Sequence, residues 1–97
     1  MKQVCDYLPE TEILAQLAEE VAELAHAALK LRRAMDGTNP TPKTEAECRE
    51  ALLEEFADVT VCAGELPIGY EGGERIACMV ETKRKRWLER LEGKTWS

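Results

Sequence analysis

The chain has 97 residues, a length that we expect to form at most one small domain with a thin core. Charged residues make up 33% and aromatic residues 5% of the chain, a composition typical of a globular helical protein rather than a disordered or membrane-embedded one. The formal net charge of −6 argues against a nucleic-acid polymer as partner, because such binding needs a positively charged face.

Several features predict a cytoplasmic protein without membrane contact. The N-terminal segment lacks the apolar region of a secretory signal peptide, and the apolar runs are too short to cross a bilayer. Without a secretory signal, we expect the cysteines to be free thiols that serve as small apolar core residues. They are Cys5, Cys48, Cys62 and Cys78, and they include no C-x-x-C pair.

Apolar residues recur at three- and four-residue spacing over 12–35, 45–66 and 74–92, a pattern that predicts three helices. Pro9 suits the entry to the first helix, and Gly37 with the prolines of "DGTNPTP" prevents its continuation.

The remaining helix ends have local signals as well. Thr44 and Glu47 form the Thr-x-x-Glu sequence of a capping box at the start of the second helix. That helix is expected to end over residues 64–67, with "IGYEGGE" as a turn, and Gly93 ends the third helix. Because no segment has a strand pattern, the predicted fold class is all-α, with one domain over residues 1–97.

The first helix is apolar on more than one side. One stripe contains Ile13, Leu24 and Leu31, and a second, smoother face consists of alanines, which allow close approach of another helix. Three helices do not suffice to cover both faces, so we expect the three-helix protomer to assemble into a helical-bundle homo-oligomer.

Carboxylates interrupt the apolar stripe of the first helix. With Ile13 at zero and 100° per residue, Glu20 falls near roughly 340°, inside the stripe. Glu23 and Gln16 lie on its flank, near roughly 280° and 300°, and Glu19 lies further out, near roughly 240°.

The second helix repeats this arrangement. Relative to Leu52, Glu55 falls near roughly 300°, inside the stripe, and Asp58 lies at its edge, near roughly 240°. Four converging carboxylates need neutralisation, and hard oxygen ligands at this density favour Mg²⁺ or Mn²⁺. The alternative is that these are solvated or salt-bridged helix faces.

The third helix carries a row of cations beside its apolar stripe. Lys83 falls inside that stripe, and Arg86 and Arg90 lie on one flank. Arg can fork onto phosphate oxygens, so the row predicts polyphosphate binding next to a metal site. The alternative is a surface helix whose cations extend into solvent.

The order of these motifs resembles a known family. Glu19-Glu20-Val21-Ala22-Glu23 on one helix, followed by Glu55-Phe56-Ala57-Asp58 on the next, is similar to the MazG-like all-α nucleoside triphosphate pyrophosphohydrolases. The resemblance extends over nearly the whole chain, although the interval between the motifs is slightly long for that family.

The resemblance implies Mg²⁺ held by Glu20, Glu23, Glu55 and Asp58 in a helical homodimer or tetramer. It also implies hydrolysis of a nucleoside or deoxynucleoside triphosphate to the monophosphate and pyrophosphate. Gln16 and Asn39 are further candidates for substrate contact, the first from the helix flank and the second from the loop's resemblance to the family.

We expect water to attack the α-phosphorus directly, because no Ser-His-Asp arrangement or reactive cysteine suggests a covalent intermediate. Glu19 is the candidate base, since it belongs to the motif but lies outside the four-ligand set.

Two rival interpretations remain at this point. Glu23 and His26 form a Glu-x-x-His sequence, which is half of the signature of carboxylate-bridged di-iron bundles. His26 falls about 60° from Glu23, however, which favours an exposed surface residue. The other rival is a non-catalytic helical dimerisation module.

Overall fold

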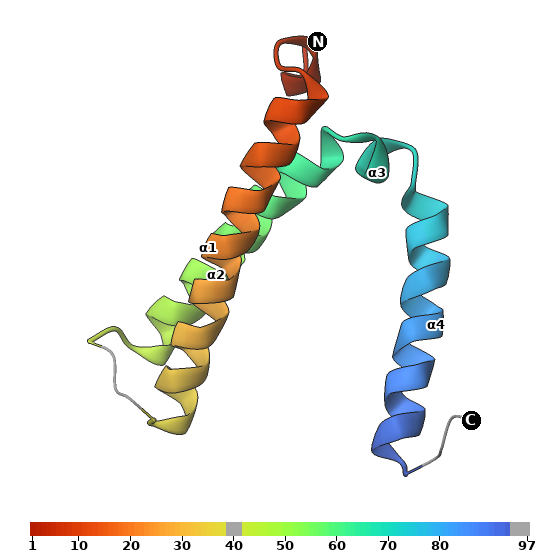
Figure 1. The fold of residues 1–97 in the computed structure, drawn as a ribbon. Helices are drawn as coiled ribbons and strands as arrows, with labels where there is room; N and C mark the ends of the chain where they lie inside the picture. The colour runs from red at the N-terminus through yellow and green to blue at the C-terminus, as the bar shows by residue number, and fades with distance from the viewer. Residues whose placement is uncertain (39–41, 94–97) are drawn as a thin grey trace.

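The computed structural model describes residues 1–38 and 42–93, and this part of the chain is helical without a β-strand. After a short 3₁₀ turn, Val4–Asp6, come three long helices and one short one (Figure 1). They are α1 (Glu10–Asp36), α2 (Glu45–Gly64), α3 (Pro67–Tyr70) and α4 (Gly73–Leu91). The three predicted helices are therefore confirmed, each within two residues of its expected ends.

Local signals in the sequence account for the ends of α1 and α2. α1 ends at Gly37, whose φ of 73° is the left-handed conformation that glycine adopts readily, and the Gly37 N–H donates to the Arg33 carbonyl at 2.9 Å. α2 begins with the predicted capping box. The Glu47 N–H donates to Thr44 Oγ1 at 3.1 Å, and the Thr44 N–H donates to Glu47 Oε1 at 3.0 Å.

The segment between α2 and α4 differs from the expectation of a simple turn, because residues 67–70 form the helical turn α3. Pro67 occupies the start of α3, where its missing N–H costs no hydrogen bond. α3 lies directly against the end of α2, and a Cβ at Gly69 would be 2.0 Å from the Ala63 carbonyl oxygen. Only glycine permits this approach, which fixes the direction in which the chain leaves α2.

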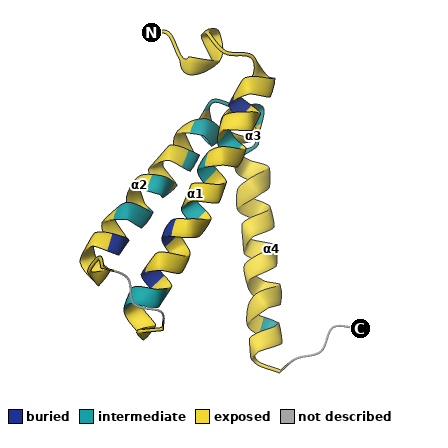
Figure 2. Cartoon of the chain, turned by 60° about the vertical axis from the view of Figure 1, so that its left-hand side comes forward, coloured by how far each residue is buried: buried dark blue, intermediate teal, exposed yellow. Residues whose placement is uncertain are grey.

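α1 and α2 form an antiparallel hairpin, and the apolar core lies between and at the end of these two helices (Figures 1 and 2). Among the residues that the structure describes, the buried ones are few: Ile13, Ala27, Leu31, Cys48 and Leu66. The cysteine prediction holds in part. All four are free thiols, but only Cys48 is buried and Cys62 half-buried, whereas Cys5 and Cys78 are exposed.

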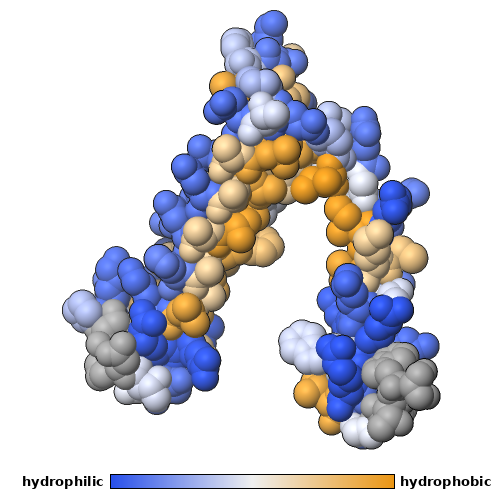
Figure 3. Space-filling view, in the orientation of Figure 1, coloured by the Kyte–Doolittle hydropathy of each residue, from blue (hydrophilic) through white to orange (hydrophobic). Residues whose placement is uncertain are grey.

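Among the described residues, α4 packs along neither α1 nor α2, and its main helix contact is with α3 (Figure 1). The Cα radius of gyration is 17.2 Å, against about 13 Å for a compact domain of this length. Apolar side chains consequently cover the sides of the hairpin and of the first half of α4 that face each other (Figure 3). The exposed apolar side chains of α4 are Ile76, Met79, Val80, Trp87, Leu88 and Leu91.

No helix among the residues that the structure describes is both long enough and apolar enough to cross a membrane.

Candidate metal centre

Three carboxylates from two helices meet at the middle of the α1–α2 hairpin. Glu20 and Glu23 come from α1, and Glu55 comes from α2. One carboxylate oxygen of each lies within 4.8 Å of those of the other two. The sequence pattern puts Glu20 and Glu55 on the apolar faces along which the two helices pack, and the packing of the helices brings them to the same height.

The two inner carboxylates are only partly satisfied by the protein. Gln16 Nε2 donates a hydrogen bond to Glu20 Oε1 at 2.8 Å, one helical turn away. The second oxygens, Glu20 Oε2 and Glu55 Oε2, are shielded from solvent and have no hydrogen-bond partner among the described residues. Shielding a carboxylate oxygen without a partner is unfavourable, so this site is electrostatically incomplete.

Several negative charges lie close together in this cluster. Burial raises the pKa of the Glu55 carboxyl, and the charges of Glu23, Asp58 and Glu20 raise it further. Burial also raises the pKa of the Cys62 thiol, with added repulsion from Glu20 and Asp58. A group that resists ionisation because its neighbours are anionic is one that a bound cation would stabilise.

The fourth predicted ligand, Asp58, lies outside the set of three within 4.8 Å. It is exposed on α2, one turn beyond Glu55, and its charge still acts on Glu55 and Cys62. The structure thus brings three of the four predicted ligands together and leaves Asp58 at the rim. The donor set, carboxylate oxygens with a side-chain amide nearby, could hold a hard divalent cation and does not select one such ion over another.

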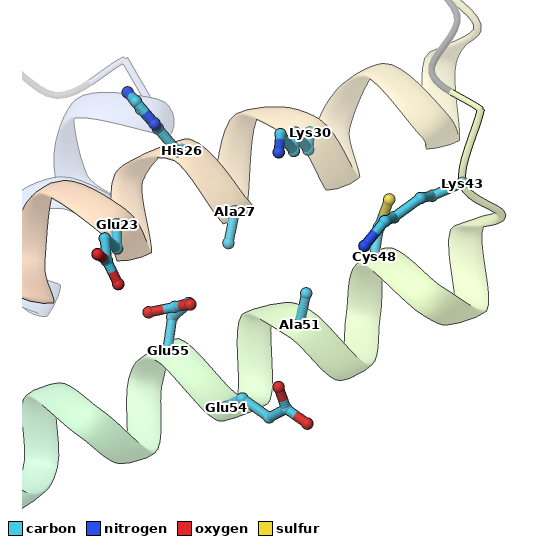
Figure 4. A pocket seen from close by; sticks show the side chains of 9 residues that line it. All are labelled: Glu23, His26, Ala27, Lys30, Lys43, Cys48, Ala51, Glu54 and Glu55. Atoms are coloured by element: carbon cyan, nitrogen blue, oxygen red, sulfur yellow. The ribbon is translucent and has the colours of Figure 1, made fainter.

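The site opens into a trough of about 370 Å³ between α1 and α2 (Figure 4). Glu23 and Glu55 face each other across one end of the trough, and Ala27 and Ala51 point toward each other beyond them. At the other end lie Cys48, Lys30 and Lys43, and His26 and Glu54 complete the lining.

Sequence reasoning missed this trough and its two lysines. The sequence does contain a signal for the trough. Positions 27 and 51 are alanines on the packing faces, one turn from Glu23 and Glu55, and larger side chains there would fill the space. Glu54 is exposed and stands at the trough's edge, with its carboxylate directed away from Ala51 (Figure 4).

The other candidates on the hairpin have distinct positions. Glu19 is exposed on α1, next to the cluster in sequence but outside it. Gln16 contacts Glu20 and so orients a carboxylate of the cluster. His26 is exposed, as expected, and its ring points away from Glu55 (Figure 4), so it does not add a nitrogen ligand to the three carboxylates. Asn39 lies outside the described residues.

The predicted cation row, Lys83, Arg86 and Arg90, is exposed on α4. Lys83 and Arg86 line a shallow hollow on that helix with Met79. Because α4 does not pack along α1 or α2 in the described part of the chain, the row is not brought to the carboxylates within one chain. The cations that line the trough beside the carboxylates are instead Lys30 and Lys43.

Comparison of the chain with models of known protein families, with curated proteins and with solved structures found no match. The case for a function therefore rests on the geometry above and on the order of the motifs in the sequence.

Proposed function

We propose that this protein is a Mg²⁺-dependent nucleoside triphosphate pyrophosphohydrolase of the MazG-like kind, acting on a nucleoside or deoxynucleoside triphosphate. The observation that carries the proposal is the set of three carboxylates from two helices, of which Glu20 Oε2 and Glu55 Oε2 are shielded and without a partner. A protein that needed these residues only for packing would lose nothing by replacing them with apolar ones.

Glu20, Glu23 and Glu55 would hold the metal, and Asp58 would contribute from the rim, directly or through water. Mg²⁺ bound there would neutralise the carboxylates, screen the charge of the triphosphate and activate water for attack. Gln16 restricts the orientation of Glu20 by its hydrogen bond to Oε1, which leaves Oε2 without a protein partner and available to a metal.

In the proposed reaction, a water oxygen bonds to the α-phosphorus while the bond from that phosphorus to the bridging oxygen of the β-phosphate breaks. Glu19 accepts the proton of the water, since it is exposed, adjoins Glu20 in the sequence and lies outside the ligand set. Pyrophosphate leaves with the bridging oxygen, and the nucleoside monophosphate keeps the oxygen of the water.

The proposal includes a homo-oligomer, a dimer or a tetramer. The apolar side chains that α4 and the hairpin expose would be covered by a second copy. Such an assembly is also what would bring the α4 row, Lys83, Arg86 and Arg90, to phosphates held at the carboxylates of another protomer.

The test is to incubate the purified protein with Mg²⁺ and a panel of nucleoside and deoxynucleoside triphosphates, and to measure pyrophosphate. We expect Glu20→Ala and Asp58→Ala to abolish its release while the helical signal is kept. Glu50→Ala, an exposed carboxylate on α2 outside the cluster, is the matched control and should retain activity. Full activity of Glu20→Ala, or release of orthophosphate with a diphosphate, would refute the proposal.

Two further measurements define the reaction. Hydrolysis in ¹⁸O-labelled water should place the label in the nucleoside monophosphate, and label in pyrophosphate would mean that water attacks elsewhere. Glu19→Gln should lower the turnover number more than it changes the Michaelis constant, because a base acts in the transition state. A protein that self-associates but yields no pyrophosphate from any nucleotide would instead be the non-catalytic dimerisation module.

A further inference from the structure

The trough between α1 and α2 has opposite charge at its two ends. Glu23 and Glu55 stand at one end, and Lys30 and Lys43 stand at the other (Figure 4). On α1, seven residues separate Glu23 from Lys30, which corresponds to about 10 Å along the helix. A ligand that fills this trough must therefore carry or bind a cation at one end and present an anion about 10 Å away.

The walls between these two ends offer little to a polar ligand. Ala27, Ala51 and Cys48 contribute methyl groups and a thiol, none of which is a strong hydrogen-bond donor. Recognition therefore has to come from the ends of the trough. The volume of about 370 Å³ is at the lower end of the range for small-molecule sites and admits a chain of phosphates.

Lys30 differs from two other cations of the hairpin, Arg32 and Arg49. Arg32 pairs with Asp36, with 3.6 Å between Nε and Oδ2, and Arg49 pairs with Glu45, with 3.0 Å between Nη2 and Oε2. Lys30 forms no ion pair in the described part of the chain, so its ammonium group is available to a ligand.

Lys43 already acts on a neighbouring carboxylate. Hydrogen bonds with Thr44 lower the pKa of the Glu47 carboxyl, and the positive charge of Lys43 lowers it further. In the sequence, Lys43 precedes Thr44, the N-cap residue of α2, and its side chain lines the trough. A lysine ammonium in these surroundings can serve a carboxylate and a phosphate in turn, because it has three donors.

We propose that Lys30 and Lys43 bind the outer phosphates of the substrate, the part that leaves as pyrophosphate, while the carboxylate end holds the metal. This inference rests on the proposed function, and it assigns the phosphate contact to two residues of the hairpin itself. The ligand class is a linear polyphosphate anion complexed with a divalent cation. Lysine suits this role because a compact ammonium is a point charge that tolerates the varied geometry of a flexible phosphate chain.

The direct test measures the affinity of inorganic tripolyphosphate with Mg²⁺ by calorimetry, which requires no turnover. We expect Lys30→Gln and Lys43→Gln each to weaken binding by about tenfold, the loss typical of one charge-assisted hydrogen bond. Lys85→Gln, which removes an exposed lysine of α4, is the matched control and should bind as the wild type does. Mn²⁺ affinity without phosphate should be unchanged in the two hairpin variants.

A second variant separates occupation of the trough from general attraction of anions. Ala51→Leu adds three carbon atoms to the floor and leaves every charge in place, so it should weaken tripolyphosphate binding if the phosphates lie in the trough. Unchanged affinity in Ala51→Leu, with circular dichroism showing a folded protein, would overturn the proposal. Wild-type affinity in both lysine variants would overturn it as well.

Kinetics decide between phosphate and base recognition. Loss of a phosphate contact should raise the Michaelis constant by a similar factor for every nucleotide that the wild type hydrolyses. A change in base preference would show that the lysines face the base, and the inference would be wrong. If the wild type hydrolyses no nucleotide but tripolyphosphate binding still depends on the two lysines, the proposed function fails and the phosphate site stands.

Discussion

Replacing Leu31 by Ala tests whether the α1–α2 hairpin is the stable unit that holds the carboxylates in place. Leu31 is 8% exposed and lies on the face of α1 that packs against α2. The substitution removes three buried carbon atoms, which costs about 2.4 kcal/mol at about 0.8 kcal/mol for each. The cavity left behind raises the expected loss into the range of about 2–5 kcal/mol.

Such a loss is large for this protein. Small domains have total stabilities of roughly 5–15 kcal/mol, and a core of five buried residues places this one toward the low end. At about 4–8 °C for each kcal/mol, Leu31→Ala should lower the melting temperature by about 10 °C or more. The assay is thermal unfolding followed by far-UV circular dichroism, at low protein concentration and in chelator.

Leu29→Ala is the matched control, because it makes the same chemical change on the same helix at a position that is 50% exposed. It should shift the melting temperature by no more than a few degrees under these conditions. If the two variants melt at the same temperature at low concentration, the hairpin is not packed as described and does not hold the half-buried carboxylates together.

Three other predictions follow from single features of the structure. The pKa of Glu55 is raised, so in chelator the folded state holds the Glu55 proton more tightly than the unfolded state does. The free energy of unfolding should therefore fall as pH rises above 4.5. Glu55→Gln should remove that fall in urea titrations repeated across pH. Thr44→Ala removes the cap of α2 and should cost about 1 kcal/mol in the same titration, whereas loss of no stability would contradict the capping box. If α4 of one copy contacts phosphates at the carboxylates of another copy, a mixed oligomer of the Glu20→Ala and Arg86→Ala proteins contains sites with both intact residues. Mixing the two variants should then restore hydrolysis, and no recovery in a proven hybrid oligomer would exclude that arrangement.

The sequence alone determined the three long helices and their ends to within two residues, because the signals for both are local, but it did not reveal the short helix α3. A capping box starts α2, and a glycine with positive φ ends α1, whatever the rest of the chain does. The fixed turn of 100° per residue also placed Glu20 and Glu55 inside apolar stripes before any packing was known. The half-buried positions of both carboxylates in the structure confirm that reasoning.

Only the tertiary structure decided which faces meet and at what height along the helices. Periodicity gives the direction of a side chain around its own axis, but it contains no information on the axial offset of the partner helix. That offset places Glu23 within 4.8 Å of the inner pair while Asp58 stays at the rim, and it sets Ala27 beside Ala51 to open the trough toward Lys30.

The position of α4 shows the same limit most clearly. Its cations and apolar stripe are readable from sequence, and the natural expectation was that they complete the carboxylate site. Within one chain they do not, because Gly69 and the helical turn α3 direct α4 away from the hairpin. The short connection through α3 thus decides what surrounds the 19 residues of α4. The residues that precede a helix set its direction, and the pattern along the helix does not reveal that direction.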